Sequence, residues 1–542
     1  MKKLLSVLLA AMLLLAMAGV AGAAAPEEAT GGITFTGVVL GEKVDVYKVI
    51  EYTYDTKSGQ YTDAKWVDAI QQWISGTYNV SNLAVDETPN GVSETAFYEA
   101  MRAYIVDEAK WSPIADYKSG LRAGSYICLI SGGSTVHQLH LVSLTPQQKD
   151  DGTWELISEA VDATQKASRP VLDKTMTAEG KGTKQDHDTV AIGDTVTFDI
   201  YATVPEYPDD VDENHKTHTT YTITDTMAKG LTLNRDSIKV SLIGKEQPLV
   251  EETDYTLTIH DANVDHGFTI DFKYNSIKSA ATGEVRAWNS EAGAGYEGRV
   301  DTTDKKFVLD KGVHIQYTAV VNSGIQLESD ENENHAKLVY SNNPYGESTS
   351  EINDEVKVYT YGLKINKVDG KSGTALAGAE FEINVKDKGD EKLYFVPGNG
   401  AGEYIVAKSN ASGAVTKLIT PDSGKITIKG LDVGKYELRE ITAPENYNKL
   451  TQPVEFEITP LKADDDKGTV TMKYVKDGYE EIGVEKKPSA YLPETINNFT
   501  GIQVPSTGGM GTTIFMVAGI AVMACAVVAL MLVLKRQKHS EG

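Results

Sequence analysis

The sequence predicts a mainly β protein, in which tandem β-sandwich domains follow a small α+β domain and precede a C-terminal transmembrane helix. Helical periodicity is confined to residues 33–165, and after Pro170 short runs alternate between apolar and polar residues with turn signals between them. Residues 514–534 carry no charged side chain. These three observations set the expected order of the domains.

The domain predicted over residues 26–168 mixes helices with strands. One helix is expected to open at Thr62-Asp63 and a second at Ser93, because apolar residues recur at helical spacing after each. The apolar positions are Trp66, Ile70, Trp73 and Ile74 in the first helix, and Phe97, Met101, Tyr104 and Ile105 in the second. Strand-like runs at 44–50 and 126–130 flank both helices, which predicts an α+β domain.

Two β domains are predicted after it, over residues 169–360 and 361–503. In the first of them, Val196, Phe198 and Ile200 alternate with polar residues. Successive side chains of a strand point to opposite faces, so this alternation is typical of strands with one buried face. Short strands of this kind, separated by turns, predict β-sandwiches.

The N-terminus has the pattern of a secretory signal. Lys2 and Lys3 precede an apolar run over residues 4–17, and Ala21-Gly22-Ala23 resembles a cleavage site. Residues 1–25 are therefore predicted to be a signal peptide.

The C-terminus combines three features. Residues 514–534 are long enough to cross the hydrocarbon core of about 30 Å as a helix. The basic tail, residues 535–542, is then predicted to stay in the cytoplasm. The segment Val504-Pro505-Ser506-Thr507-Gly508-Gly509 (504–509) stands before the helix. In this order the three features resemble the cell-wall sorting signal that sortases cleave.

In that family, the sortase cuts the peptide bond that here lies between Thr507 and Gly508, and it passes the Thr507 acyl group to an amine. The usual first residue of the motif is Leu, and this chain has Val504. A pocket distinguishes one methylene by only about 1–3 kcal/mol, so Val504 is still expected to bind. The departure leaves open which sortase does the cutting.

Composition narrows the functional classes. The chain has 52 basic and 77 acidic residues and a net charge of −25, which argues against a nucleic-acid partner. Its only cysteines are Cys128 and Cys525, so the mature exported part is expected to have no internal disulfide. No nucleophile–base pair, metal-ligand spacing or phosphate-binding loop stands out, and neither an enzyme nor a cofactor or metal site is predicted.

Polar residues occupy the core face of the last domain. Lys367 shares its strand face with Leu363 and Ile365, Glu440 lies in phase with Leu438, and Asn498 lies in phase with Ile496. Unpaired buried charges are costly, so these residues are expected either to meet partners in the core or to lie at the ends of the sheets.

The middle domain repeats this order. Lys174 lies in phase with Met176, and Asp225 lies in phase with Ile223. Asn342, in phase with Leu338 and Tyr340, is the expected third member. Asn343 remains an alternative, since only strand phase separates the two asparagines.

Such a triad has a chemical use. A desolvated lysine loses its proton and becomes a nucleophile, whereas a desolvated carboxylic acid keeps its proton. The amine can then attack the asparagine carboxamide while the acid shuttles protons, and ammonia leaves. The expected product is a Lys–Asn isopeptide bond.

The last domain resembles a known family. The segments 364–369, 376–381 and 436–444 look like a collagen-adhesin B-type domain. In that family the matching lysine, glutamate and asparagine form the crosslink, which implies Lys367, Glu440 and Asn498. Asn446 replaces the usual glycine after Ala443-Pro444, and asparagine tolerates the left-handed conformation that this turn needs.

The whole arrangement resembles the major (backbone) pilins assembled by class C sortases. The resemblance implies a variable N-terminal domain followed by tandem Ig-like sandwiches, A-type and then B-type. It also implies a subunit whose Thr507 is joined to a lysine of the next subunit. Lys166 occupies the family's position for that lysine at the end of the first domain, although the usual Tyr-Pro before it is missing. A solvated linker lysine is the alternative interpretation.

The predicted function is therefore that of a structural pilus backbone at the cell surface, anchored to the cell wall after a membrane-held precursor stage. The implied partners are a sortase, other copies of the chain and peptidoglycan, with accessory tip or base pilins as further candidates. The alternative is a monomeric wall-anchored adhesin that binds a host or glycan ligand.

Overall fold

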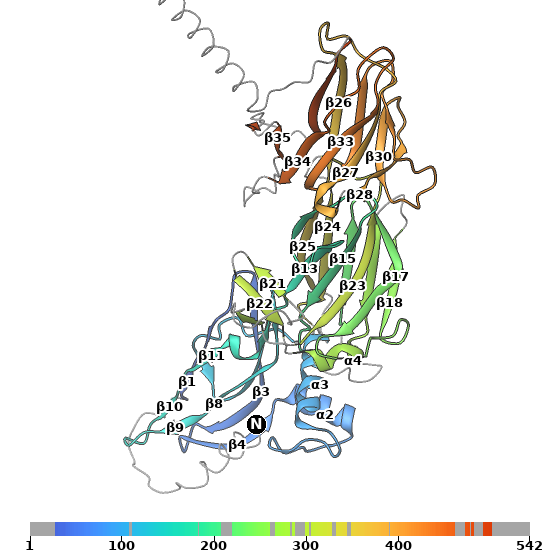
Figure 1. The fold of residues 1–542 in the computed structure, drawn as a ribbon. Helices are drawn as coiled ribbons and strands as arrows, with labels where there is room; N and C mark the ends of the chain where they lie inside the picture. Colours follow the sequence, from blue (N-terminus) through green and yellow to red (C-terminus); the bar gives the residue numbers. More distant parts are fainter. Residues whose placement is uncertain are drawn as a thin grey trace, which may run out of the picture. The chain divides into compact units, whose positions relative to one another are not determined.

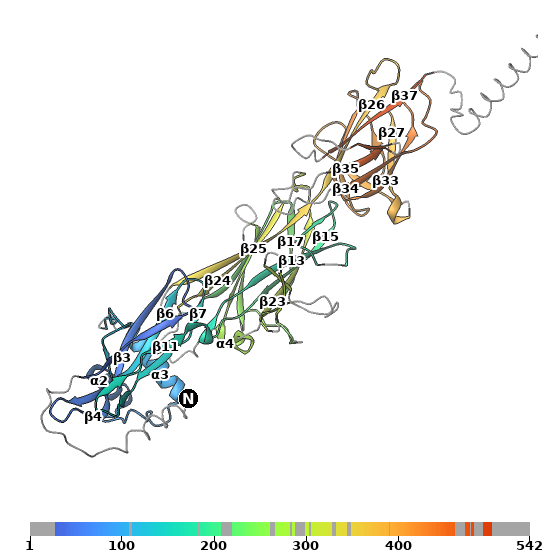
Figure 2. The ribbon, with the colours of Figure 1, turned by 90° about the vertical axis from the view of Figure 1, so that its left-hand side faces the viewer.

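The computed structural model describes residues 28–500, with gaps at 108–110, 183, 208–218, 246, 261–265, 282–284, 288–298, 303–304, 310, 328–331, 344–347, 390, 461–471, 477–478 and 482–490. The chain forms two compact units, Met1–Tyr359 and Thr360–Gly542. The first unit contains two sets of sheets, called here the first region (28–168) and the middle region (169–359); the second unit is called the last unit (Figures 1 and 2). The chain is mainly β, as predicted.

The first region is built on an antiparallel sheet of order β4-β3-β6-β8. Its strands are β3 (Glu42–Asp55), β4 (Gln60–Trp66), β6 (Gly124–Gly132) and β8 (His140–Leu144). Helices α2 (Asp68–Tyr78) and α3 (Glu94–Asp107) share one apolar core with this sheet. The expected start of the first helix at Thr62 is wrong, because β4 continues through Trp66 as it pairs with β3. Ser93 does precede α3, and its Oγ accepts the N–H of Ala96 at 3.2 Å.

Short strand pairs complete the first region. They are β1 (Thr30–Gly31) with β5 (Leu121–Arg122), β2 (Ile33–Thr36) with β11 (Glu159–Asp162), β9 (Pro146–Gln148) with β10 (Trp154–Leu156), and β7 (Val136–His137) with β12 (Ala167–Ser168). The 3₁₀ helix η1 (Ala163–Lys166) joins β11 to β12.

The middle region contains a four-stranded and a six-stranded sheet. The four-stranded sheet has the order β13-β15-β23-β17: β13 (Leu172–Ala178), β15 (Thr195–Ala202), β23 (Val313–Val321) and β17 (Leu231–Leu242). The six-stranded sheet has the order β14-β25-β24-β16-β19-β18: β14 (His187–Thr189), β25 (Thr349–Tyr359), β24 (Glu333–Ser341), β16 (Tyr221–Met227), β19 (His266–Phe272) and β18 (Tyr255–Ile259). Short elements accompany them: α4 (Tyr274–Ile277), η2 (Lys278–Ala280), β20 (Val285–Ala287), β21 (Arg299–Thr302) and β22 (Lys305–Leu309).

The inner faces of these two sheets meet in one core. The edge of Phe268, on the six-stranded sheet, packs on the ring of Tyr317, on the four-stranded sheet, with 5.0 Å between ring centroids. Tyr317 also stacks on Phe198 of the neighbouring strand at 5.2 Å. The alternating apolar residues predicted for β15, Val196, Phe198 and Ile200, are buried in this core.

The last unit is a second two-sheet domain. One sheet has the order β29-β30-β32-β26-β37: β29 (Tyr394–Pro397), β30 (Glu403–Ala407), β32 (Lys425–Leu431), β26 (Tyr361–Asp369) and β37 (Tyr491–Asn498). The other contains β27 (Glu380–Val385), β28 (Glu391–Lys392), β31 (Leu418–Ile419), β33 (Gly434–Thr442), β34 (Val454–Pro460), β35 (Met472–Lys476) and β36 (Tyr479–Glu481), with η4 (Lys386–Lys388) after β27. Asn446 has a φ of 70°, the left-handed conformation expected for it.

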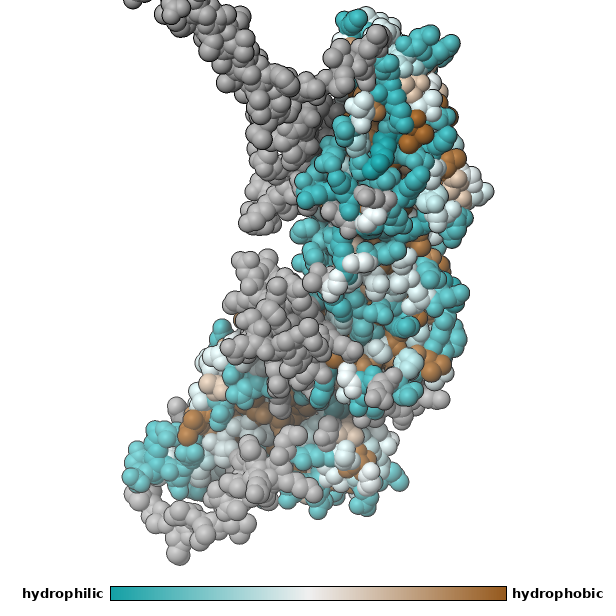
Figure 3. Space-filling model, in the orientation of Figure 1, coloured by the Kyte–Doolittle hydropathy of each residue, from teal (hydrophilic) through white to brown (hydrophobic). Residues whose placement is uncertain are grey.

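Hydrophilic residues dominate the described surface on the face drawn in Figure 3. Among the described residues, no helix is both long and apolar enough to cross a membrane. The predicted signal peptide, sorting motif, transmembrane helix and basic tail lie outside the described residues.

Candidate functional site

The middle region contains a buried lysine cluster that links its two sheets. Lys174, on β13 of the four-stranded sheet, is ion-paired with Oδ2 of Asp225 on β16, and neither side chain is exposed. The Lys174 Nζ also donates to Oδ1 of Asn334 on β24 at 2.8 Å. We call Lys174, Asp225, Asn334 and Tyr317 the middle cluster.

The predicted third residue of this cluster, Asn342, is wrong. Its Nδ2 donates to the carbonyl of Gly133 at 3.0 Å and to Ser350 at 2.8 Å, and its Oδ1 accepts from Ser348 at 2.7 Å. Asn342 therefore contacts the first region just beyond the end of β24, and the alternative, Asn343, directly follows it.

Asn334, and not Asn342, lies beside Lys174 because of the strand register. It shares its face with Asn342, but eight residues of strand separate them by about 26 Å. In the antiparallel β16–β24 pair, Met227 lies opposite Asn334 and Asp225 lies opposite Ala336. Asp225 and Asn334 are therefore diagonal neighbours on the core face. The alternation of side chains along the strand is compatible with either asparagine. The register between β16 and β24 decides that Asn334 lies near Asp225.

Burial sets the charge state of the middle cluster. It lowers the pKa of Lys174, and this effect outweighs the attraction of Asp225. It also raises the pKa of Asp225. Both directions favour a neutral amine beside a protonated carboxyl group, the two forms that amide exchange needs.

The last unit contains a second cluster of the same residue types. Lys367 on β26, Glu440 on β33 and Asn498 on β37 are all buried. The Lys367 Nζ lies 3.2 Å from Oε1 of Glu440 and donates to Oδ1 of Asn498. The Asn498 Nδ2 donates to Oε1 and Oε2 of Glu440, at 3.0 and 3.1 Å. The structure thus brings together all three residues predicted for this domain, which we call the last cluster.

Strand pairing positions the last cluster. Strands β26 and β37 are parallel neighbours, with Lys367 opposite Ile496 and Asp369 opposite Asn498. Glu440 reaches them from the other sheet and also accepts the N–H of Leu450 at 2.7 Å. Burial lowers the pKa of Lys367, against the attraction of Glu440.

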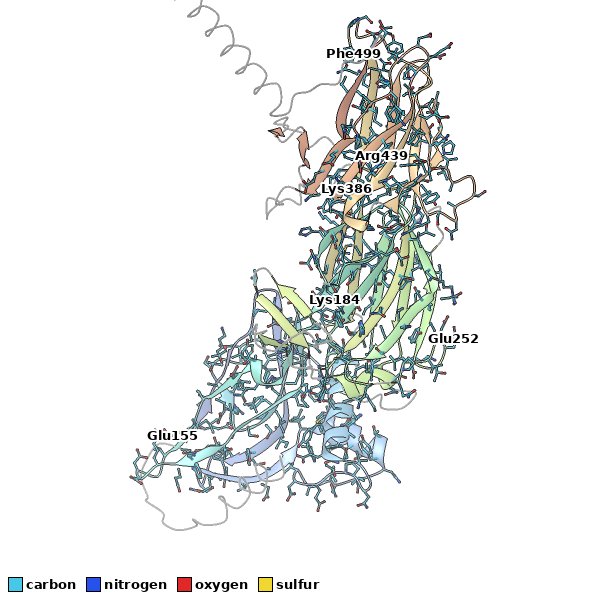
Figure 4. All side chains as sticks on the ribbon, in the orientation of Figure 1. Glu155, Lys184, Glu252, Lys386, Arg439 and Phe499 are labelled. Carbon is cyan, nitrogen blue, oxygen red and sulfur yellow. The ribbon has the colours of Figure 1, made fainter. Side chains whose placement is uncertain are left out.

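A third lysine cluster lies on the opposite face of the four-stranded sheet. Asp199 of β15 accepts from Nε2 of His314 at 2.7 Å and from Nε2 of Gln316 at 3.0 Å. The Lys184 Nζ lies 3.3 Å from Oδ2 of Asp199, and the Lys184 side chain is 36% exposed. Figure 4 labels Lys184 on this part of the middle region. We call Lys184, Asp199, Gln316 and His314 the outer cluster.

One set of side chains has the spacing of a metal site. Glu333, His335 and Glu355 offer ligand atoms within 4.8 Å of one another, all on the partly exposed face of β24 and β25. The Lys357 Nζ already lies 2.8 Å from Glu333 and 3.3 Å from Glu355. This ammonium compensates the two carboxylates, and the set is best described as an ion-pair network.

Lys166 is the last residue of η1, directly before β12. Asp162 caps this short helix by accepting the N–H and the hydroxyl of Thr164, at 3.0 and 2.7 Å. The backbone therefore places Lys166 at the end of the first region, while its side chain and the motif residues Val504, Pro505, Ser506, Thr507 and Gly508 lie outside the description.

In a comparison with known proteins, residues 362–477 match the family model of the SpaA prealbumin-like fold domain. The trypsin-resistant surface T6 protein of Streptococcus pyogenes serotype M6 is 22% identical over 481 residues, which cover 83% of this chain and 76% of that protein. The solved T6 backbone pilin of serotype M6 Streptococcus pyogenes, described as a modular three-domain structure, aligns with a TM-score of 0.55 and 18% identity. That alignment covers 88% of this chain and all of the T6 chain.

This chain has the fold of a backbone pilin. The full-length major pilin SpaD of Corynebacterium diphtheriae is also similar, with 18% identity, a TM-score of 0.44, and coverage of 87% of this chain and 97% of SpaD.

Proposed function

We propose that this chain is the polymerising backbone subunit of a covalently linked pilus on the cell surface, with internal Lys–Asn isopeptide bonds that lock its β domains. One observation carries the proposal: in a chain with the fold of a backbone pilin, each of two buried lysine amines lies beside an acid and an asparagine carboxamide. The proposed bonds are Lys174–Asn334 and Lys367–Asn498.

The same chemistry forms both bonds. The neutral Nζ attacks Cγ of the asparagine, the new C–N bond forms, and the acid returns a proton to Nδ2, which leaves as ammonia. Burial supplies the neutral amine, and the fold supplies the close approach of the reacting atoms. Each chain carries out each step once, so the chain acts on itself and is no enzyme.

The bonds lie where a fibre under tension needs them. In the last unit, β26 begins the domain and β37 ends it, side by side. A Lys367–Asn498 bond carries load from Tyr361 through Lys367 directly to Asn498, so the rest of the sandwich bears no force. In the middle region, a Lys174–Asn334 bond ties the first strand to the opposite sheet.

Polymerisation is proposed to use the two ends of the folded part. A sortase cleaves between Thr507 and Gly508, and the Thr507 acyl group is transferred to Lys166 of another copy. Residues 1–25 direct export, and residues 514–542 hold the precursor in the membrane until cleavage. The final anchor is peptidoglycan.

Blotting of cell-wall extracts tests the polymer. The wild type is compared with Lys166→Ala and with a control, Lys149→Ala, which removes an exposed lysine of the first region. We expect the wild type and Lys149→Ala to give a ladder of large, detergent-resistant species. In Lys166→Ala this ladder should collapse to monomer. A ladder that persists in that variant would move the linkage to another lysine, and a single monomer band in the wild type would leave a wall-anchored adhesin instead.

A further inference from the structure

Tyr317, like Asn334, is a member of the middle cluster that the sequence did not indicate. It lies on β23 of the four-stranded sheet, and its side chain is fully buried. The Phe198 and Phe268 rings pack against it at 5.2 and 5.0 Å. These contacts fix the direction of its hydroxyl group within the core.

The Tyr317 hydroxyl touches every group that the proposed crosslink uses. It donates to Oδ2 of Asp225 at 2.8 Å and accepts from Nδ2 of Asn334 at 2.7 Å. It also accepts from Nζ of Lys174 at 3.2 Å. The oxygen therefore lies between the acid and the nitrogen that must leave.

The last cluster shows why this position matters. There, both oxygens of Glu440 reach Nδ2 of Asn498 directly. In the middle cluster the acid is an aspartate, one methylene shorter, and its Oδ2 accepts from Lys174 and Tyr317. Its other oxygen, Oδ1, has no hydrogen-bond partner within the described residues. The tyrosine hydroxyl spans the gap that the shorter acid leaves.

We propose that Tyr317 relays a proton from Asp225 to Nδ2 of Asn334 as the Lys174–Asn334 bond forms. The inference rests on the proposed crosslink and adds to it a residue that contacts the leaving group. A hydroxyl group can do this because it both donates and accepts hydrogen bonds.

The step balances in atoms and charge. Attack of the neutral Nζ on Cγ makes a tetrahedral intermediate, in which Nδ2 regains a lone pair. Asp225 gives its proton to the Tyr317 oxygen while Tyr317 gives its own proton to Nδ2. The Cγ–Nδ2 bond then breaks and ammonia leaves, and the excess proton on Nζ passes to Asp225, which restores the acid and leaves the amide.

The surroundings suit a relay that stays protonated between transfers. Burial, followed by the nearby Asp225, raises the pKa of Tyr317 well above its ordinary value. The hydroxyl therefore passes a proton on only as it receives another.

The test follows the two bonds of one chain separately. The full chain is made by cell-free synthesis, and peptide mapping at successive times reports the Lys174–Asn334 and Lys367–Asn498 links. We expect Tyr317→Phe to slow the first link by about tenfold or more and to leave the second unchanged. Tyr221→Phe is the matched control, since it removes a buried hydroxyl of the same region that donates to the carbonyl of Thr203 at 2.9 Å. It should leave both links at the wild-type rate.

A rescue separates proton relay from packing. In the double variant Asp225→Glu with Tyr317→Phe, the longer acid can reach Nδ2 as Glu440 does, and the first link should recover. Two results would overturn the relay: a wild-type rate in Tyr317→Phe, or a double variant as slow as Tyr317→Phe while Asp225→Glu alone links normally. Absence of the Lys174–Asn334 link from the wild type would instead refute the proposed crosslink.

A second measurement needs no substitution and so does not depend on a variant that folds. A relay moves two protons together, so heavy water should slow the Lys174–Asn334 link more than the Lys367–Asn498 link of the same chain. Equal slowing of the two links would count against the relay.

Discussion

The middle cluster and the outer cluster lie on opposite faces of one four-stranded sheet and contain the same kinds of groups. In the middle cluster the lysine amine contacts both the aspartate and the amide, and in the outer cluster the lysine and the amide each contact the aspartate. In the middle cluster, Lys174 is fully buried, whereas the outer Lys184 keeps a third of its side chain in water. The residue types are therefore the same, and the environment differs.

The two aspartates respond in opposite directions. Burial raises the pKa of Asp225. Burial also acts to raise the pKa of Asp199, but the hydrogen bond from His314 and the attraction of Lys184 together lower it. The inner acid thus favours its protonated form, and the outer acid favours the carboxylate that holds its partners as an ion-pair network. The comparison indicates that the proposed crosslink needs desolvation of the lysine and the acid together, with the amide beside the lysine amine.

The largest expected effect on stability comes from the loss of Asn334 on β24. Asn334→Ala should abolish the middle-region crosslink and cost about 4–5 kcal/mol of unfolding free energy, the value typical of a covalent tie across a loop of this length. Intact mass should then show the loss of one ammonia in place of two, and denaturant unfolding gives the energy.

Asn342→Ala is the matched control. It removes hydrogen bonds to Gly133 and Ser350 and should cost only about 1 kcal/mol, with both ammonia losses retained. A missing crosslink in this control, with Asn334→Ala still linked, would return the third position to Asn342.

The next effect compares the acids. Asp225→Asn keeps the shape of the side chain but removes its proton exchange, so the Lys174–Asn334 link should fail. Asp199→Asn should leave that link intact and cost about 1–2 kcal/mol through weaker hydrogen bonds. Peptide mapping of both variants checks this, and loss of the link in Asp199→Asn would show that the two faces are coupled.

The dependence of unfolding free energy on pH should distinguish Asp354, near the middle cluster, from Asp199 of the outer cluster. Asp354 accepts the Lys174 backbone N–H at 2.6 Å, and burial raises its pKa from 3.8 to about 6. The folded state then binds this proton more tightly than the unfolded state, so stability falls as the pH rises from about 4 to about 6. Asp354→Asn should remove that fall.

For Asp199 the sign is reversed. Its lowered pKa contributes stability above about pH 4, which is lost as the pH falls through the folded-state value. Thermal unfolding of the wild type and both asparagine variants across this range measures the two slopes. Equal slopes in all three proteins would contradict the assignment.

The smallest effect is expected at the outer lysine. Lys184→Met removes an ion pair whose lysine side chain is 36% exposed, and it should change the unfolding free energy by at most about 1 kcal/mol, with both crosslinks intact. Peptide mapping would also detect any Lys184–Gln316 bond in the wild type, and finding one would break the distinction between the two faces.

Part of this architecture follows from local patterns. Alternation with period two predicted the strand faces, and it placed Lys174, Asp225, Lys367 and Glu440 towards the core, where the structure has them. Spacing and capping correctly predict that α3 follows Ser93. The first helix instead begins at Asp68, because the residues before it, which apolar spacing assigns to the helix, form a strand.

The sequence by itself determined the mainly β class, the faces of the strands and the three residues of the last cluster. Only the tertiary structure decided that Asn334 and Tyr317 complete the middle cluster. Strand phase repeats every two residues and so cannot say how far along a strand a partner lies; the register between β16 and β24 does. Tyr317 is 143 residues from Lys174 and comes near it only when the two sheets pack, because contact across a core depends on long-range pairing that no local pattern encodes.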